Sequence, residues 1–213
     1  MKKNSLIAQE GFPYIFGCFA LALVASYLGW SFFAGLAFFF TVFSAFFFRN
    51  PARVIPQDQG AIVSPADGRV LAVRRVERTP LTDKPSQVIS IFMSVFNGHM
   101  NRTPVAGTVQ KMCYHQGKFL VASKEKALTE NERNEIWLRD EAGRDVVVSQ
   151  VAGLVARRIV CYLQEGQQQA RGERFGLIQF GSRVDVYLPL DTKISVIVGQ
   201  KVKSGSSVLG FFS

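Results

Sequence analysis

The sequence predicts a mainly β protein, in which an N-terminal membrane helical hairpin precedes a compact antiparallel β-barrel or sandwich-like domain. Residues 11–48 contain no charged side chain and hold several runs of phenylalanine. From residue 60 onward, short segments rich in β-branched and aromatic residues alternate with glycine, and no long amphipathic helix is visible. We therefore expect an anchor over residues 1–48 and a β-rich domain over residues 49–213.

The apolar run is long enough for two short bilayer crossings, because one helical crossing needs about 20 apolar residues. Tyr27–Ser31 would form the bend between them. Positive residues flank the run on both sides, namely Lys2 and Lys3 before it and Arg49 and Arg53 after it. Positive charge marks cytoplasmic flanks, so the β domain is expected on the cytoplasmic side of the cell (inner) membrane. A single tilted crossing, which would place the domain on the other side, is the alternative.

The formal charge of +9 suits either nucleic acid or an anionic lipid surface as a partner. The anchor favours lipid, so no nucleic acid is expected. The three cysteines show no paired spacing, and the two histidines do not form a metal-binding motif. We therefore expect no metal site and a reducing, cytoplasmic environment.

Period-two alternation marks one strand of the β domain clearly. Val184, Val186 and Leu188 alternate with polar neighbours, which is typical of a half-buried strand. Residues 124–134 are the longest polar stretch and are expected to form a loop or short helix. The strands are expected at 69–76, 87–95, 105–114, 145–151, 157–163 and 183–188.

Three polar phrases interrupt the apolar pattern. They are Ser64–Gly68, which contains Asp67; Phe96–Pro104, which contains His99; and Phe175–Asp185, which contains Ser182. Taken singly, each has a structural explanation: a turn-forming aspartate, a satisfied histidine and a glycine–serine bulge. The sequence has no Gly-x-Ser-x-Gly elbow and no phosphate-binding glycine loop, which leaves hydrolase and nucleotide-dependent functions without support.

Taken together, in this order and spacing, the phrases resemble the phosphatidylserine decarboxylase proenzymes of the short bacterial and archaeal branch. The most specific part is Arg174-Phe175-Gly176 followed by Phe180-Gly181-Ser182-Arg183-Val184-Asp185. The resemblance implies a lyase that converts phosphatidylserine to phosphatidylethanolamine and CO2 in phospholipid biosynthesis. Further matching phrases are Phe48–Pro51, Gly117–Phe119, Asn131–Asn134 and Ala152–Ile159.

The resemblance also implies a zymogen that makes its own cofactor. Autocatalytic cleavage between Gly181 and Ser182 would leave a β chain (1–181) and an α chain (182–213), with Ser182 converted to a pyruvoyl group. That group would form a Schiff base with the amine of the substrate and accept electrons as CO2 leaves. His99 is the expected base and Asp67 its partner, by the logic of a catalytic triad. Glycine at 181 would permit a close approach that a Cβ would block.

Several details stay open within this interpretation. Gly205–Ser206 is a rival cut site, but it lies in a polar turn expected to be solvated. Longer family members carry a second histidine where this chain has Arg102, so it is open whether His99 serves both self-cleavage and decarboxylation. A phosphate and a carboxylate in the headgroup call for basic donors. The candidates for headgroup binding are Arg102, Arg157, Arg158, Arg183 and His115.

Two alternatives compete with this function. The phrase Gly199–Gly205 and the pair Lys111-Met112 partly resemble lipoyl and biotin carrier barrels, which favours a non-catalytic, membrane-tethered carrier or adaptor. The same chemistry on an ether-linked serine lipid is the other alternative. Family members are commonly oligomers of the cleaved pair, so the resemblance also implies a homo-oligomer as an expectation.

Overall fold

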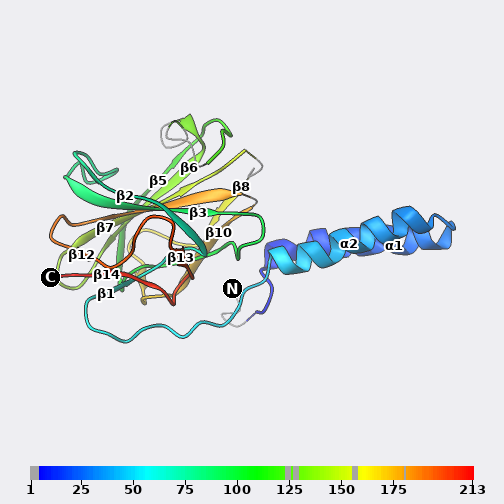
Figure 1. The fold of residues 1–213 in the computed structure, drawn as a ribbon, viewed down its shortest axis with the longest axis horizontal. Helices are drawn as coiled ribbons and strands as arrows, with labels where there is room; N and C mark the ends of the chain where they lie inside the picture. The colour runs from blue at the N-terminus through cyan, green and yellow to red at the C-terminus, as the bar shows by residue number, and fades with distance from the viewer. Residues whose placement is uncertain (1–4, 123–125, 127–129, 155–157, 180) are drawn as a thin grey trace. The chain divides into compact units, whose positions relative to one another are not determined.

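The computed structural model describes residues 5–122, 126, 130–154, 158–179 and 181–213. The chain divides into two compact units, residues 1–52 and 53–213. This division falls close to the expected boundary after residue 48. Figure 1 shows the helical unit and the β-rich unit.

The first unit is a pair of helices joined by a tight turn. A 3-10 helix, η1 (Gln9–Gly11), leads into α1 (Phe12–Tyr27), and α2 (Ser31–Phe47) follows. Gly29 has a φ of +74°, a left-handed conformation that favours glycine, and it lies between the helices. An antiparallel bridge between Ile7 and Arg49 joins the two ends of the unit. The helices therefore run side by side as a hairpin (Figure 1).

The outer faces of this hairpin are apolar. Phe32 is 76% exposed and Phe16 65% exposed, and many other large apolar side chains of both helices also face outward. Such continuous apolar surface needs a non-aqueous neighbour. The helical stretch Gln9–Tyr27 is long and apolar enough to cross a membrane by length and composition, whereas Ser31–Phe47 is shorter. The apolar surface and the length of the first helix thus indicate that this unit associates with a membrane.

The second unit is built from short antiparallel strands, as the sequence predicts. Its strands are β1 (Ala61–Val63), β2 (Gly68–Val76), β3 (Ser86–Met93), β4 (Met100–Arg102), β5 (Gly107–His115), β6 (Arg133–Arg139), β7 (Asp145–Val151), β8 (Arg158–Cys161), β9 (Gln168–Gln169), β10 (Arg174–Gln179), β11 (Ser182–Leu188), β12 (Lys193–Ile194), β13 (Lys201–Val202) and β14 (Val208–Phe211).

Within the described residues these strands form one large sheet and two small ones. The large sheet has the order β13-β2-β3-β11-β7-β6-β5-β9 and curls into a half-barrel. The small sheets have the orders β1-β14-β12 and β4-β10-β8. All of these pairings are antiparallel. Among the described strands, only β2-β3, β5-β6 and β6-β7 in the large sheet join strands that follow one another in the chain, so most neighbouring strands come from distant parts of the sequence.

Strand β11 lies in the middle of the large sheet, between β3 and β7. Val184, Val186 and Leu188 are fully buried in the main apolar core. The opposite face is buried as well, because Arg183 is only 4% and Asp185 0% exposed. The prediction of a half-buried strand was therefore wrong: the polar half of the alternation lies inside the protein as a charge pair.

The sequence located most of the long strands but missed others. Strand β6 was not predicted, because its ends are polar; in the fold, Arg133 pairs with Glu135 and Arg139 with Asp145. Strand β10 was also missed. Within the polar stretch 124–134, residues 124, 125 and 127–129 lie outside the described residues, so the expectation of a loop or helix is untested there. It was wrong at the end of the stretch, where Arg133 and Asn134 begin β6.

Candidate active site

The first residue of the central strand, Ser182, is fully buried. It lies opposite Met93, the last residue of β3, and its Oγ is 3.5 Å from the Met93 Sδ. A thioether is a weak acceptor and not a base, so the hydroxyl is neutral in this arrangement. Gly181 lies in a bend directly before the strand and is partly exposed.

The surroundings of Gly181 are open on the side where a side chain would stand. Apart from its own chain neighbours, none of the described atoms lies within 4 Å of the place of a Cβ on Gly181. The Gly181 carbonyl oxygen packs against Gly153. A close approach of Ser182 to Gly181 stays a prediction.

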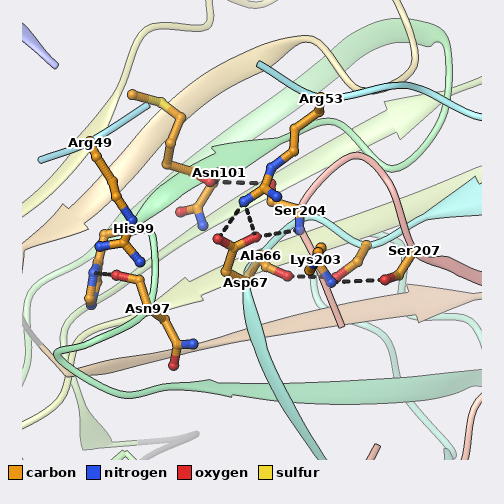
Figure 2. Close-up of polar contacts among 12 residues, drawn as sticks. Arg49, Arg53, Ala66, Asp67, Asn97, His99, Asn101, Lys203, Ser204 and Ser207 are labelled. Atoms are coloured by element: carbon orange, nitrogen blue, oxygen red, sulfur yellow. Dashed lines mark hydrogen bonds and ion pairs between the residues drawn. The ribbon is translucent and has the colours of Figure 1, made fainter. Parts of the chain in front are cut away.

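His99 lies at the end of the connection that follows Met93. The connection is closed by Asn97, whose side-chain oxygen accepts hydrogen bonds from the Ser94 backbone N–H and hydroxyl, each at 2.8 Å. The His99 Nδ1 lies 3.0 Å from the backbone carbonyl oxygen of Asn97 (Figure 2). A carbonyl can only accept, so Nδ1 carries the proton in the neutral ring, and Nε2 is the basic nitrogen.

Asp67 follows a tight turn in which the Ser64 hydroxyl donates to the Ala66 carbonyl at 2.7 Å. Its carboxylate accepts two hydrogen bonds from the Arg53 guanidinium, at 2.7 and 3.0 Å, and one from the Ser204 backbone N–H, at 2.7 Å (Figure 2). The carboxylate also lies against Gly98, where a Cβ would come within 2.7 Å of Oδ2. Asp67 is thus held beside the residue that precedes His99.

These contacts add to the expected roles. The Asn97 carbonyl contacts the imidazole Nδ1, while Asp67 is held by Arg53 and Ser204. The role of Asp67 in holding the ring stays a prediction. An electrostatic effect of Asp67 on His99 stays a prediction. The sequence predicted Arg53 only as a positive charge that flanks the anchor. Its place just after the Phe48–Pro51 phrase is the one signal that could have indicated a role in the site.

The candidate basic residues have different environments. Arg102 on β4 is buried, and its guanidinium donates to the Gly172 carbonyl oxygen at 2.9 Å. Burial, followed by the positive charges of Arg174 and Arg53, lowers the pKa of Arg102 to about 10. The positive charges of Arg102, Arg53 and Arg174 thus act on one another close to Asp67.

The Arg183 guanidinium is buried and binds other buried side chains. It donates to Asp185 Oδ1 at 2.7 Å and to the Ser90 hydroxyl at 2.6 Å. Arg158 is exposed at the start of β8. Arg157 lies outside the described residues.

His115 lies in the same large sheet as Ser182 but three strands away from it. It pairs with Arg133 on β6, and β6 and β7 separate β5 from β11. Three strand spacings correspond to about 14 Å. The His115 Nε2 lies 3.0 Å from the Glu135 carboxylate, which points to a local structural contact.

A buried row of amides leads toward Ser182 and was not anticipated. The Asn134 side chain donates to Gln150 at 3.0 Å, and Gln150 donates to Asn101 at 2.9 Å. The Asn101 amide lies 3.8 Å from the same Met93 sulfur that Ser182 contacts. Asn101 and Asn134 occur in phrases of the sequence resemblance, but Gln150 carries no sequence signal.

The rival serine lies in a different setting. Gly205 has a φ of +74° and donates its N–H to the Ser64 carbonyl at 2.7 Å, and Ser206 donates to the Lys203 carbonyl at 3.1 Å. Gly205 is buried and Ser206 partly buried. The expectation that this turn is solvated was therefore only partly right; its backbone forms a regular hydrogen-bonded turn that supports Asp67.

Comparison with known proteins extends the resemblance across the chain. A sequence model of the phosphatidylserine decarboxylase family matches residues 40–210. A phosphatidylserine decarboxylase proenzyme from Magnetococcus marinus is 48% identical over 213 residues, covering 99% of this chain and 97% of that protein. Proenzymes from Ralstonia nicotianae (51% identical, 97% and 95% covered) and Syntrophus aciditrophicus (47% identical, both fully covered) are similar as well. The predicted family is thereby confirmed, and the chain belongs to the phosphatidylserine decarboxylase family.

Proposed function

We propose that this chain is a self-processing phosphatidylserine decarboxylase, cut between Gly181 and Ser182 into chains of residues 1–181 and 182–213. The burial of Ser182 at the first position of a strand paired on both sides carries this proposal. The pairing fixes the serine backbone, and burial keeps water from competing with the hydroxyl. Such prior positioning supplies much of the rate of an intramolecular acyl transfer.

The proposed cleavage begins with attack of the Ser182 Oγ on the carbonyl carbon of Gly181. The hydroxyl proton goes to a base, the peptide C–N bond breaks, and an ester C–O bond forms. Loss of the Ser182 α-proton then breaks the Cβ–O bond and releases Gly181 as a carboxylate. Water converts the remaining dehydroalanine to a pyruvoyl group with release of ammonia.

His99 is the proposed base, acting through Nε2. The Asn97 carbonyl holds the proton on Nδ1, so Nε2 is available to accept the serine proton in the neutral ring. The protonated ring is then a candidate to return a proton after CO2 leaves. Asp67 would stabilise that positive charge at a distance, while the ion pair with Arg53 holds its carboxylate in place.

The surroundings of Ser182 suit the pyruvoyl group that the family implies. The Ser182 hydroxyl contacts the Met93 thioether, and the Asn101 amide contacts the same sulfur, and both groups are uncharged. A neutral keto amide therefore needs no counter-charge there. When formed, the group supplies the electron sink for decarboxylation.

We propose phosphatidylserine in the membrane as the substrate, with the catalytic unit on the cytoplasmic side of the inner membrane. Arg102 and Arg158 are the proposed donors for the phosphate and carboxylate of the headgroup, since Arg183 is held by Asp185. An ether-linked serine lipid carries the same headgroup, and comparing turnover of the two lipids separates these substrates. We also propose that the cleaved pair assembles into a homo-oligomer.

The carrier alternative receives no support from the position of its candidate lysine. Lys111 lies within β5, opposite Trp137 of β6, and not at the tip of a hairpin. A carrier lysine has to protrude from a tight turn to reach its partners. We therefore retain the decarboxylase as the single proposal.

Intact-mass analysis of the purified full-length chain tests the proposal. We expect two chains that together account for the 23.7 kDa precursor, the smaller beginning with a pyruvoyl group at position 182. Ser182→Ala should remain uncut and inactive, whereas Ser206→Ala should be cut normally. An uncut chain that nevertheless decarboxylates phosphatidylserine would refute the mechanism.

A further inference from the structure

Gly153 lies directly against the peptide bond that is proposed to break. The pairing of β11 with β7 ends at Arg183 opposite Val151, so two residues further along each strand Gly181 comes to lie beside Gly153. A Cβ added to Gly153 would stand 2.0 Å from the Gly181 carbonyl oxygen and 3.0 Å from its carbonyl carbon. Contacts this short do not occur, so any side chain at position 153 must displace the Gly181 carbonyl.

The steric demand for glycine is therefore clear at position 153, across from the proposed cut. At Gly181 itself, a Cβ would meet none of the described atoms within 4 Å apart from those of its own chain neighbours. The Cβ added to Gly153 would also lie 3.2 Å from the Ala122 Cβ. Ala122 is only 2% exposed, so the space on this side of Gly153 is bounded by both Ala122 and the Gly181 carbonyl.

We propose that Gly153 is a positioning residue for self-cleavage. Because Gly153 has no side chain, the Gly181 carbonyl can lie against its Cα in the orientation that the Ser182 hydroxyl attacks. This inference rests on the proposed cut between Gly181 and Ser182. The contact of the Gly181 carbonyl with Gly153 fixes the plane of the Gly181–Ser182 peptide, while the pairing of Ser182 with Met93 fixes the position of the nucleophile. Neither contact involves the base, so the effect of Gly153 is on geometry and not on proton transfer.

The expected size of the effect follows from the clash. Restoring an ordinary Cβ–oxygen contact from 2.0 Å requires the carbonyl to move by about 1 Å. Displacement of about that size can slow an intramolecular reaction roughly 100-fold. The Gly153→Ala precursor should therefore accumulate uncut where the wild-type chain is fully cleaved.

A matched control separates positioning from a general loss of stability. Gly210 on β14 meets a comparable clash, with a Cβ 2.5 Å from the Lys193 carbonyl oxygen, but it lies in a different sheet from Ser182. Gly210→Ala should lower the unfolding midpoint and still be cut to completion. Cleavage is followed by intact mass on full-length chains in detergent, with unfolding midpoints measured in the Ser182→Ala background.

Hydroxylamine identifies the step that is blocked, because it cleaves an ester at Ser182 but not the peptide. We expect the uncut Gly153→Ala chain to resist hydroxylamine, since the ester does not form. Cleavage by hydroxylamine at that position would show that the acyl shift still occurs and would overturn the proposal. Cleavage of Gly153→Ala at the wild-type rate, or equal slowing in Gly210→Ala, would overturn it as well.

A second variant decides the matter if Gly153→Ala does not fold. Ala122→Val adds bulk on the side of Gly153 where the Gly181 carbonyl lies, and it should slow cleavage measurably while the unfolding midpoint is retained. Unchanged cleavage in Ala122→Val would then contradict the proposal. If the wild-type chain itself stays uncut, the proposed function fails instead, so the two failures are distinguishable.

Discussion

The buried Arg183–Asp185 pair offers the sharpest test of how the central strand is held together. The guanidinium and the carboxylate are 2.7 Å apart, with side-chain exposures of 4% and 0%. The Ser90 hydroxyl completes the guanidinium contacts from the neighbouring strand. Replacing Arg183 with Met keeps most of the volume and leaves the Asp185 charge buried without its cation.

The cost can be worked out from this geometry. Two unit charges about 4 Å apart attract by about 4 kcal/mol at an effective dielectric constant near 20. Removing one partner of a buried pair typically costs about 3–5 kcal/mol, because the remaining charge stays desolvated. For a chain of this size each kcal/mol lowers the unfolding midpoint by roughly 2–4 °C. Arg183→Met should therefore lower the midpoint by roughly 6–20 °C.

The assay is thermal unfolding of the full-length chain in detergent, with Ser182→Ala present so that the chain stays intact. The exposed pair Lys84–Asp145 is the control, since its lysine is 66% exposed; Lys84→Met should cost no more than about 1 kcal/mol. The double variant Arg183→Met, Asp185→Leu should recover more than half of the loss, as apolar replacement of buried pairs does. An unchanged midpoint for Arg183→Met, with a raised KM in the cleavable chain, would show instead that Arg183 binds the headgroup.

Four further outcomes are expected. Arg102→Met should raise the KM for phosphatidylserine with a smaller change in kcat, measured by CO2 release, because it removes a cation beside Asp67. Gln150→Leu should lower stability by about 1–3 kcal/mol, measured by chemical unfolding, because two buried amide partners lose their hydrogen bonds. Deleting residues 1–48 should reduce activity on bilayers more than self-cleavage; equal losses in both assays would contradict the anchoring role. Burial, followed by Glu132, raises the pKa of Tyr114 to about 12, so the folded state holds this proton more tightly than the usual pKa of 10 allows. Stability should then fall as the pH rises from 10 to 12, and less so in Tyr114→Phe, as unfolding midpoints at pH 8 and 11 will show.

The fold could be predicted from the sequence where local signals are strong. The uncharged run of residues 11–48 is long enough to cross a bilayer, which predicts membrane helices. The β segments show period-two alternation between glycines, which predicts short strands. Strand β6 and the buried polar face of β11 could not be predicted, because their burial is decided by partners far along the chain. Arg183 is a typical surface residue by type, and only Asp185 and Ser90 make its burial tolerable.

The site was predictable only as a set of phrases. Asp67, His99 and Ser182 were identified from the resemblance, but no spacing in the sequence indicates that Arg53 and Ser204 meet at Asp67. Gly153 lies in the quoted phrase Ala152–Ile159, where glycine has no evident purpose until the neighbouring strand is in place. Contacts between residues far apart along the chain carry these roles, so a single sequence leaves them unassigned.

The location of Ser182 at the start of a strand makes the proposed self-cleavage compatible with a stable fold. From Arg183 onward, β11 is paired on both sides, so the serine backbone cannot drift when its peptide is attacked. Gly181 lies outside that pairing and is limited chiefly by the contact of its carbonyl with Gly153. A cut at this boundary leaves the paired residues from Arg183 to Leu188 in one piece, so the shorter chain can stay bound as the central strand. Self-cleavage there is compatible with an intact core, whereas a cut at any position from 183 to 188 would sever the strand that the core is built around.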